Sequence, residues 1–285
     1  MRLRVAVGQF APEKAEVERN LDTIAEAMRQ AVAEAADLLV LPEAATTGYF
    51  LEGGVLEAAL SSDQLASKLS SRVGRLEREL WTVVGFYENS DGRLTNSAAL
   101  LRAEGAGVEV RGVYRKFFLP TYGVFDEERF VSRGRELGVF ETPWGKLGIL
   151  ICEDVWHSIL PTLNAAAGAQ ILAVPAASPA RGFTGEHIAN HDRYRRLFRA
   201  ISEEHGLFCV NAQLCGFEGG KGFVGGSVVV DPFGNTLAEA PVADPAMVVA
   251  DLDLATVAIA RAQSPLLADL QSAWGDVRRL VHEID

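Results

Sequence analysis

Short apolar runs alternate with helical segments along this chain, and this alternation restricts the folds that are open to it. The strand-like run Leu3–Phe10 precedes a segment of helical composition, Ala15–Ala36, which is followed by the continuous apolar run Leu38–Leu41. A second helical segment, Gln64–Leu80, precedes the strand-like residues Thr82–Tyr87. Because a strand without polar positions is buried on both faces, the pattern predicts an α/β protein whose helices cover its strands.

The middle of the chain has antiparallel character. Thr95–Arg102 and Gly107–Tyr114 form one predicted hairpin, and Gly138–Thr142 and Lys146–Cys152 form another. Hairpins of this kind exclude a simple Rossmann fold, in which helices join the strands. The other predicted elements are the helices Pro161–Gly168 and Asn190–His205 and the strands Ala169–Pro175, Leu207–Leu214, Gly226–Asp231 and Met247–Asp253. No linker interrupts this order, so residues 1–285 are predicted to form a single domain.

The charge balance excludes some classes of partner. The net charge is −11 and no basic run occurs, which argues against nucleic acid and against an anionic membrane surface as partners. The sequence contains no stretch of about 18 apolar residues, so it predicts no membrane span. The first apolar run is too short for a signal peptide. Three cysteines, Cys152, Cys209 and Cys215, suit a reducing compartment better than a disulfide framework. We therefore expect a cytoplasmic protein that acts on a small molecule.

Three titratable side chains stand where apolar runs end. Glu43 follows four apolar residues and a proline, Lys116 lies among aromatic and aliphatic residues, and Cys152 ends the run Gly148-Ile149-Leu150-Ile151. Partial burial raises the pKa of a carboxylate and suits it to proton transfer. A thiol with a nearby base, a fixed cation and backbone N–H groups is sufficient for acyl transfer. Taken singly, each side chain also has a structural interpretation. Glu43 could cap a helix, Lys116 could be an edge residue, and Cys152 could be a core thiol. The three together, in this order, favour catalysis.

These segments resemble the nitrilase superfamily of carbon–nitrogen hydrolases, and the resemblance covers essentially the whole chain. It implies an α/β fold, a nitrilase-like α-β-β-α sandwich, in one carbon–nitrogen hydrolase domain. The Glu-Lys-Cys catalytic set of the superfamily falls on Glu43, Lys116 and Cys152. A further family glutamate, after the lysine motif, falls on Glu127.

The resemblance implies a mechanism that physical chemistry supports. Glu43 takes the thiol proton of Cys152, and the thiolate attacks an amide carbonyl. Lys116 and the backbone N–H of Glu153 stabilise the oxyanion. Glu43 then protonates the departing amine, and water releases the acid from a thioester. Glu127 orients the substrate or assists the base.

The resemblance also bears on cofactors and assembly. None of these steps needs a metal or an organic cofactor. His187 and His191 have the spacing of zinc proteases, but Ile188 replaces the glutamate found there, so we interpret the pair as one face of a surface helix. Superfamily members commonly dimerise, which implies a homodimer or higher homo-oligomer formed through the helices after Cys152 and through Pro265–Ile284.

The residues around the cysteine indicate the kind of amide. Glu153-Asp154-Val155-Trp156 resembles the glutaminase domains of glutamine-dependent NAD synthetases, as do Leu119–Glu127 and Gly225-Gly226-Ser227. The chain departs from those domains at Gly216–Val224, and we expect it to lack their second domain. We therefore expect a free-standing amidase that cleaves a small linear amide to a carboxylic acid and ammonia.

Other functions stay open on the sequence alone. One is a glutaminase subunit that supplies ammonia to a separate synthetase, and another is a ureidopropionase-like hydrolase of N-carbamoyl amino compounds. The second is weakened because carbamoyl hydrolases usually carry arginine close behind the cysteine, where this chain has Val155-Trp156-His157. An acyltransferase uses the same thioester. Tyr122, Trp156 and Arg181 are candidates for substrate binding, and Arg181 suits a substrate carboxylate, although a solvated loop arginine explains it as well.

Overall fold

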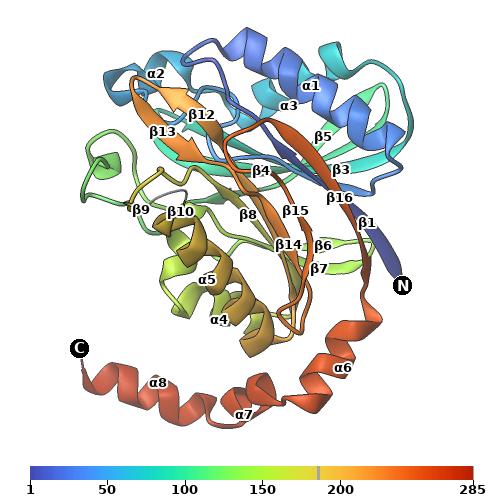
Figure 1. Ribbon diagram of the computed structural model, residues 1–285, viewed down its shortest axis with the longest axis vertical. Coiled ribbons are helices and arrows are strands. Elements are labelled where there is room, and N and C mark those ends of the chain that lie inside the picture. Colours follow the sequence, from blue (N-terminus) through green and yellow to red (C-terminus); the bar gives the residue numbers. More distant parts are fainter. Residues whose placement is uncertain (185–186, 285) are drawn as a thin grey trace.

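Two six-stranded β-sheets lie face to face, and helices cover the outer face of each sheet (Figure 1). The computed structural model describes residues 1–184 and 187–284. The first sheet has the order β16 (Ala246–Asp253), β1 (Arg2–Gln9), β2 (Leu38–Val40), β3 (Leu76–Ser90), β4 (Arg93–Gly105) and β5 (Gly107–Arg115). The second has the order β15 (Thr236–Glu239), β14 (Val228–Val230), β11 (Phe208–Gln213), β8 (Ala169–Ala176), β7 (Gly145–Ile149) and β6 (Val139–Thr142). The layers confirm the predicted α-β-β-α sandwich.

The helices divide between the two outer faces. The first sheet is covered by α1 (Val17–Ala33) and α3 (Ser62–Val73), and the second by α4 (Ile159–Ala166) and α5 (Ala189–His205) (Figure 1). The remaining elements are short and lie mostly near one edge: η1 (Glu52–Gly54), α2 (Val55–Ala58), η2 (Glu127–Arg129), η3 (Cys152–Trp156), β9 (Phe183–Thr184), β10 (His187–Ile188), β12 (Cys215–Glu218) and β13 (Lys221–Val224). Among the described residues, no helix has the length and hydrophobicity that crossing a membrane requires.

Alternate residues of the central strands face different layers. Val5, Val7 and Val40 are buried in the core between the sheets, whereas Ala6 and Leu39 belong to the core beneath α1 and α3. Successive side chains of a strand point to opposite faces, so a strand between two apolar layers is apolar at every position. This arrangement explains the continuous apolar runs of the sequence.

The predicted helix Gln64–Leu80 is wrong at its C-terminal end. Helix α3 ends at Val73 because Gly74 has a φ of 72°, which leaves the helical region. Strand β3 then begins at Leu76 and pairs with β4. The polar residues Glu77-Arg78-Glu79 have helical composition, but they lie within β3, between the paired residues Leu76 and Leu80, where the register with β4 shifts.

The C-terminal residues form an arm beside the second sheet's helices. Helices α6 (Ala255–Gln263), α7 (Leu266–Ser272) and α8 (Trp274–Glu283) follow one another away from the sandwich (Figure 1). Helix α7 contacts α4 and α5, whereas α8 contains no buried residue. Leu280 and Val281 of α8 are 51% and 50% exposed, so this helix presents apolar side chains to its surroundings.

Candidate active site

Cys152 lies at a sharp turn between a buried strand and a short helix. Strand β7 ends at Ile149, and η3 starts at Cys152 itself. The φ of Cys152 is 47°, a left-handed value that is strained for a residue with a Cβ. The thiol is nearly buried, and its Sγ lies 3.5 Å from the hydroxyl of Tyr194 on α5. The turn therefore holds the predicted nucleophile in one orientation.

Glu43 and Lys116 form a fully buried ion pair. The lysine Nζ lies 2.7 Å from Oε1 of Glu43, and neither side chain is exposed. Glu43 follows β2, and Lys116 follows the last residue of β5. Close approach of β3 requires Gly85, because a Cβ at this position would lie 2.3 Å from the carbonyl oxygen of Pro42 and 2.6 Å from Cα of Glu43. The first sheet thus places both predicted residues at one site.

Glu127 completes the buried charge cluster. Its Oε1 accepts a hydrogen bond from Lys116 Nζ at 2.8 Å and another from the hydroxyl of Tyr49. Burial raises the pKa of Glu127 to about 7, against the opposing effect of Lys116. The structure therefore brings together the four residues that the sequence assigned to catalysis, and it adds Tyr49.

Asn96 joins the two carboxylates, and the sequence analysis did not identify it. Its Nδ2 donates to Oε1 of Glu43 at 2.8 Å and to Oε1 of Glu127 at 3.2 Å. The Oε2 atoms of both glutamates are buried and have no hydrogen-bond partner among the described residues. Because an unpaired buried carboxylate oxygen is unfavourable, each is an open acceptor for a proton or an amide N–H.

The electrostatics of the cluster favour a resting thiol and a charged lysine. Burial and the charge of Glu43 raise the pKa of Cys152 well above that of a free cysteine, and Lys116 opposes this effect. Burial disfavours the charged form of Lys116, but Glu127 and Glu43 outweigh it and raise the lysine pKa. A thiol with a raised pKa reacts only when a base takes its proton during attack.

Asp154 connects the Cys152 turn to the segment that carries Lys116. Its carboxylate is fully buried and accepts hydrogen bonds from the backbone N–H groups of Phe117 at 3.1 Å and Phe118 at 2.8 Å. It also accepts from the Tyr114 hydroxyl at 2.8 Å. Burial raises the pKa of Asp154 to about 6. The sequence analysis used Asp154 only as part of a substrate pattern, whereas its contacts are made within the protein.

A cavity of about 420 Å³ opens beside the nucleophile. The three side chains predicted to bind substrate, Tyr122, Trp156 and Arg181, all line it, together with Cys152. The side chain of Glu153 lies there too and accepts a hydrogen bond from the Tyr122 hydroxyl at 2.8 Å. Other lining residues that the sequence did not single out are Pro120, Phe125, Pro179, Gly182, Ala189, Asn190, Arg193 and Tyr194. We call this space the thiol cavity.

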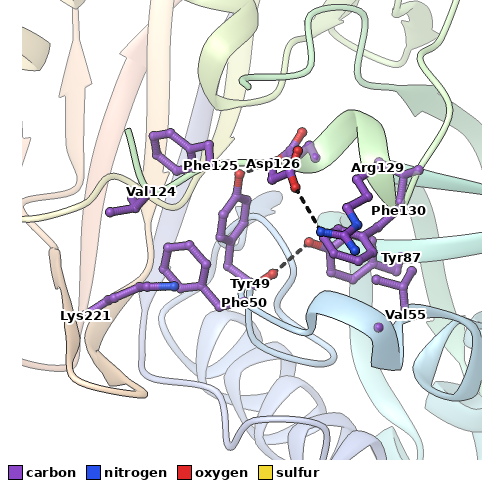
Figure 2. Close-up of a pocket in the computed structure, with 13 residues that line it drawn as sticks. Tyr49, Phe50, Val55, Tyr87, Val124, Phe125, Asp126, Arg129, Phe130 and Lys221 are labelled. Carbon is purple, nitrogen blue, oxygen red and sulfur yellow. Dashed lines mark hydrogen bonds and ion pairs between the residues drawn. The ribbon is translucent and has the colours of Figure 1, made fainter. Parts of the chain in front are cut away.

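A second cavity of about 420 Å³ lies next to Glu127 (Figure 2). Figure 2 shows Tyr49 and Phe50 between Lys221 on one side and Tyr87 on the other. The ammonium of Lys221 lies 4.0 Å from the centre of the Phe50 ring. Phe125 lines both this space and the thiol cavity.

Glu218 of β12 fixes the backbone beneath Tyr49. Its carboxylate is 4% exposed and accepts hydrogen bonds from the N–H groups of Tyr49 at 3.0 Å and Phe50 at 2.9 Å. The Tyr87 hydroxyl donates to the carbonyl of Tyr49 at 2.8 Å. These bonds hold the tyrosine that donates to Glu127. This glutamate lies on the hairpin β12–β13, in the segment where the chain departs from the glutaminase domains.

The predicted histidine pair does not occupy one helix. His187 belongs to β10, and its side chain lies outside the described part of the structure, whereas His191 belongs to α5. Nε2 of His191 lies 3.5 Å from Oε1 of Glu239. Cys209 is fully buried in the core.

Comparisons with known proteins agree with this geometry. The profile of the carbon–nitrogen hydrolase family matches residues 4–262. A glutamine-dependent NAD(+) synthetase of Thermotoga maritima is 33% identical over 259 residues, which are 89% of this chain but only 42% of the synthetase. A deaminated glutathione amidase of Escherichia coli O157:H7 is 31% identical over 270 residues, which are 92% of this chain and 95% of the amidase.

A solved structure shares both the fold and part of the sequence. The Nesterenkonia AN1 amidase, from the nitrilase superfamily, superposes with a TM-score of 0.72 at 28% identity, over 95% of this chain and 97% of the amidase. The chain therefore belongs to the carbon–nitrogen hydrolase family, in the amidase branch of the nitrilase superfamily.

Proposed function

We propose that this chain cleaves a small linear amide to a carboxylic acid and ammonia through a thioester on Cys152. The observation that carries the proposal is the buried cluster of Glu43, Lys116 and Glu127, whose charges act on a protonated thiol. Two of its carboxylate oxygens have no partner among the described residues. Such a cluster is costly to bury, and acyl transfer uses each of its members.

The first half of the reaction forms the thioester. Glu43 accepts the thiol proton while Sγ of Cys152 bonds to the amide carbon. The oxyanion is stabilised by Lys116 Nζ and by the backbone N–H of Glu153. The C–N bond then breaks, the proton on Glu43 passes to the departing nitrogen, and ammonia leaves. Glu127 holds Lys116 in place and offers an acceptor to the amide N–H.

The second half releases the acid. Glu43 takes a proton from water as its oxygen attacks the thioester carbon, and the C–S bond breaks. The proton returns to the sulfur of Cys152, which restores the resting thiol. A related structure supports a nucleophilic cysteine, though not the thioester itself: a mutant of the Nesterenkonia AN1 amidase carries the acetamide moiety of fluoroacetamide on its active-site cysteine.

Two alternative functions use the same chemistry. A glutaminase subunit that passes ammonia to a separate synthetase is supported by the 33% identity to an NAD synthetase of which this chain spans 42%. An N-carbamoyl amino compound also presents a linear C–N bond. Stimulation of glutamine turnover by an added synthetase distinguishes the first, and release of carbon dioxide together with ammonia distinguishes the second.

We also infer a cytoplasmic homodimer or higher homo-oligomer. Cys152, Cys209 and Cys215 are all free thiols, which fits a reducing compartment. Helix α8 has exposed Leu280 and Val281 and no buried residue, so a second copy of the chain is a suitable cover for it. Sedimentation tests the assembly, and a monomer at micromolar concentration contradicts it.

The activity is tested by ammonia release from a panel of amides. The panel contains aliphatic amides, ω-amides, glutamine and carbamoyl amino acids, and mass spectrometry identifies any acyl group held on Cys152. We expect ammonia from at least one linear amide, with the matching acyl mass. Ammonia release without any acyl-enzyme in rapidly quenched samples contradicts the thioester.

A further inference from the structure

The hydroxyl of Tyr194 is a buried polar group that the mechanism described above does not use. It lies 3.5 Å from Sγ of Cys152, which is a hydrogen-bond distance for sulfur. Tyr194 is 6% exposed and belongs to α5, whereas Cys152 lies in the turn after β7. The contact therefore joins the reacting sulfur to a helix that carries none of Glu43, Lys116 and Glu127.

Packing fixes the ring that carries this hydroxyl. Tyr194, Phe198 and Ile201 belong to the buried stripe of α5, which contacts β11 and β14 of the second sheet. The centre of the Tyr194 ring lies 4.9 Å from that of Trp156, at an angle of 82°, and 5.8 Å from that of Phe198. Trp156 belongs to η3, which starts at Cys152. One short helix therefore holds both the sulfur and a ring that orients the tyrosine.

The hydroxyl is the donor in this contact when the sulfur is charged. Burial and the charge of Cys152 raise the pKa of Tyr194 well above its ordinary value, so the hydroxyl keeps its proton while a thiolate forms. Burial and the charge of Glu43 raise the pKa of Cys152, and Lys116 and the Tyr194 hydroxyl oppose them. Since hydrogen bonds to ionised groups are the stronger ones, this bond strengthens as the thiol loses its proton.

The strength of this hydrogen bond changes during the reaction in the direction that catalysis requires. The sulfur gains negative charge as Glu43 takes its proton, and again as the C–S bond of the thioester breaks. Between these two steps its electron pair lies in the C–S bond, and the sulfur is a weak acceptor. A bond that is stronger in a transition state than in the states on either side lowers the barrier. The hydroxyl thus favours both formation and breakdown of the thioester.

We propose that Tyr194 is a further catalytic residue, whose hydroxyl donates a hydrogen bond to Sγ of Cys152 while this sulfur carries charge. The inference rests on the proposed function, because that function makes Cys152 the nucleophile. The tyrosine keeps its own proton throughout. The thiol proton passes to Glu43 as the S–C bond forms, and the sulfur regains a proton from Glu43 as that bond breaks. Loss of the hydroxyl therefore slows the reaction without changing its products.

Alkylation by iodoacetamide tests the contact independently of hydrolysis. Tyr194→Phe keeps the ring and removes only the hydroxyl, and mass spectrometry follows the Cys152 peptide. One charge-assisted hydrogen bond changes the thiolate fraction by about tenfold, and the greater nucleophilicity of the unbonded thiolate offsets roughly half of this on a logarithmic scale. We therefore expect alkylation at neutral pH to be about threefold slower in Tyr194→Phe.

Tyr87→Phe is the matched control for alkylation. Tyr87 is also a buried tyrosine, but its hydroxyl donates to the carbonyl of Tyr49 instead of to the sulfur. We expect the Cys152 peptide of Tyr87→Phe to be alkylated at the wild-type rate. Urea unfolding of both variants confirms that they are folded before the rates are compared.

Rapid-quench kinetics then test the two steps of hydrolysis. We expect Tyr194→Phe to lower the rate constants for acylation and for deacylation of Cys152 each by about three- to tenfold. The loss is the same for two linear amides that differ in the length of the acyl chain, because the hydroxyl acts on the sulfur. A tyrosine that only shaped the thiol cavity would instead change KM, and by different factors for the two amides.

The outcomes separate the inference from the function on which it rests. If folded Tyr194→Phe is alkylated at the wild-type rate, or if its rate loss depends on the acyl chain, the inference is overturned while amide hydrolysis stands. If no amide of the wider panel releases ammonia and Cys152 acquires no acyl group, the proposed function fails. The catalytic role of Tyr194 then fails with it, even where alkylation is slowed.

Discussion

The carboxylate of Asp154 accepts a hydrogen bond from the backbone N–H of Phe118 at 2.8 Å, which ties the turn of the nucleophile to the segment after Lys116. The same side chain accepts from the N–H of Ile151 at 3.1 Å, immediately before Cys152. One buried carboxylate therefore sets the position of the thiol relative to the lysine, although its hydrogen bonds go to neither of these side chains. The two sheets meet in this contact, since Lys116 follows β5 of the first and Cys152 follows β7 of the second.

Replacement of Asp154 by asparagine is expected to lower both stability and kcat. The amide group turns one acceptor oxygen into a donor that faces backbone N–H groups, and an unsatisfied buried polar group costs about 1–3 kcal/mol. Urea unfolding measures the stability and ammonia release measures kcat. Asp276→Asn, at an exposed carboxylate, serves as the control. An Asp154→Asn variant as stable and as active as the wild type contradicts the role assigned to this residue.

Glu127 is expected to make the protein less stable as the pH rises. Burial raises its pKa from 4.5 to about 7, so the folded state keeps a proton that the unfolded chain releases. This contribution to stability is complete below pH 4.5 and is lost as the pH rises to about 7. We expect Glu127→Gln to flatten the fall of unfolding free energy over this range, by up to about 1.4 kcal/mol per pH unit. Urea titrations at a series of pH values measure the slope, and an unchanged slope sinks the prediction.

Tyr49→Phe is expected to shift the pH dependence of activity. The Tyr49 hydroxyl donates to Glu127 and lowers its pKa, against the larger effect of burial, so loss of the hydroxyl raises that pKa further. If activity requires ionised Glu127, the acid limb of the kcat profile moves to higher pH. Tyr87→Phe is the control, because its hydroxyl donates to the carbonyl of Tyr49 instead. Coincident profiles for Tyr49→Phe and the wild type contradict the expected shift.

Gly85→Ala is expected to displace Glu43. The new Cβ would lie 2.3 Å from the carbonyl oxygen of Pro42 and 2.8 Å from the backbone nitrogen of Ala44, so the backbone of the Glu43 turn has to move. We expect a loss of about 1–3 kcal/mol in unfolding free energy, typical of overpacking, together with a large loss of kcat. Gly107→Ala, where the nearest atom is 3.8 Å away, is the matched control. Wild-type activity in Gly85→Ala rules out the tight packing described for this turn.

Local sequence pattern located Glu43, Lys116 and Cys152 because each interrupts or ends an apolar run, and such a position is visible without knowledge of the fold. Glu127 has no such pattern and came only from the family resemblance. The layered fold was predictable for a similar reason, since strands buried on both faces leave continuous apolar runs. The end of α3 was not predictable, because the polar residues after Leu76 have helical composition although they lie within β3.

The residues that support the site depend on tertiary structure. Asn96 stands within β4 and Glu218 on a hairpin, and each reaches its partners only after distant segments meet. Arg193 resembles any solvated arginine of a polar helix until α5 is placed beside the thiol cavity. Asn96 and Glu218 are polar residues buried in strands, but Asn96 stands between the polar residues Thr95 and Ser97, so no break in an apolar run marks it in the sequence.

The central claim is that Cys152 carries the acyl group during amide hydrolysis, and rapid-quench mass spectrometry tests it most directly. The wild type is mixed with an amide that it turns over, quenched in acid, digested and compared with Cys152→Ala, with Cys209→Ala as the control. The account predicts an acyl adduct on the Cys152 peptide of the wild type and of Cys209→Ala, and neither adduct nor ammonia release in folded Cys152→Ala. Ammonia release by Cys152→Ala at the wild-type rate would contradict it.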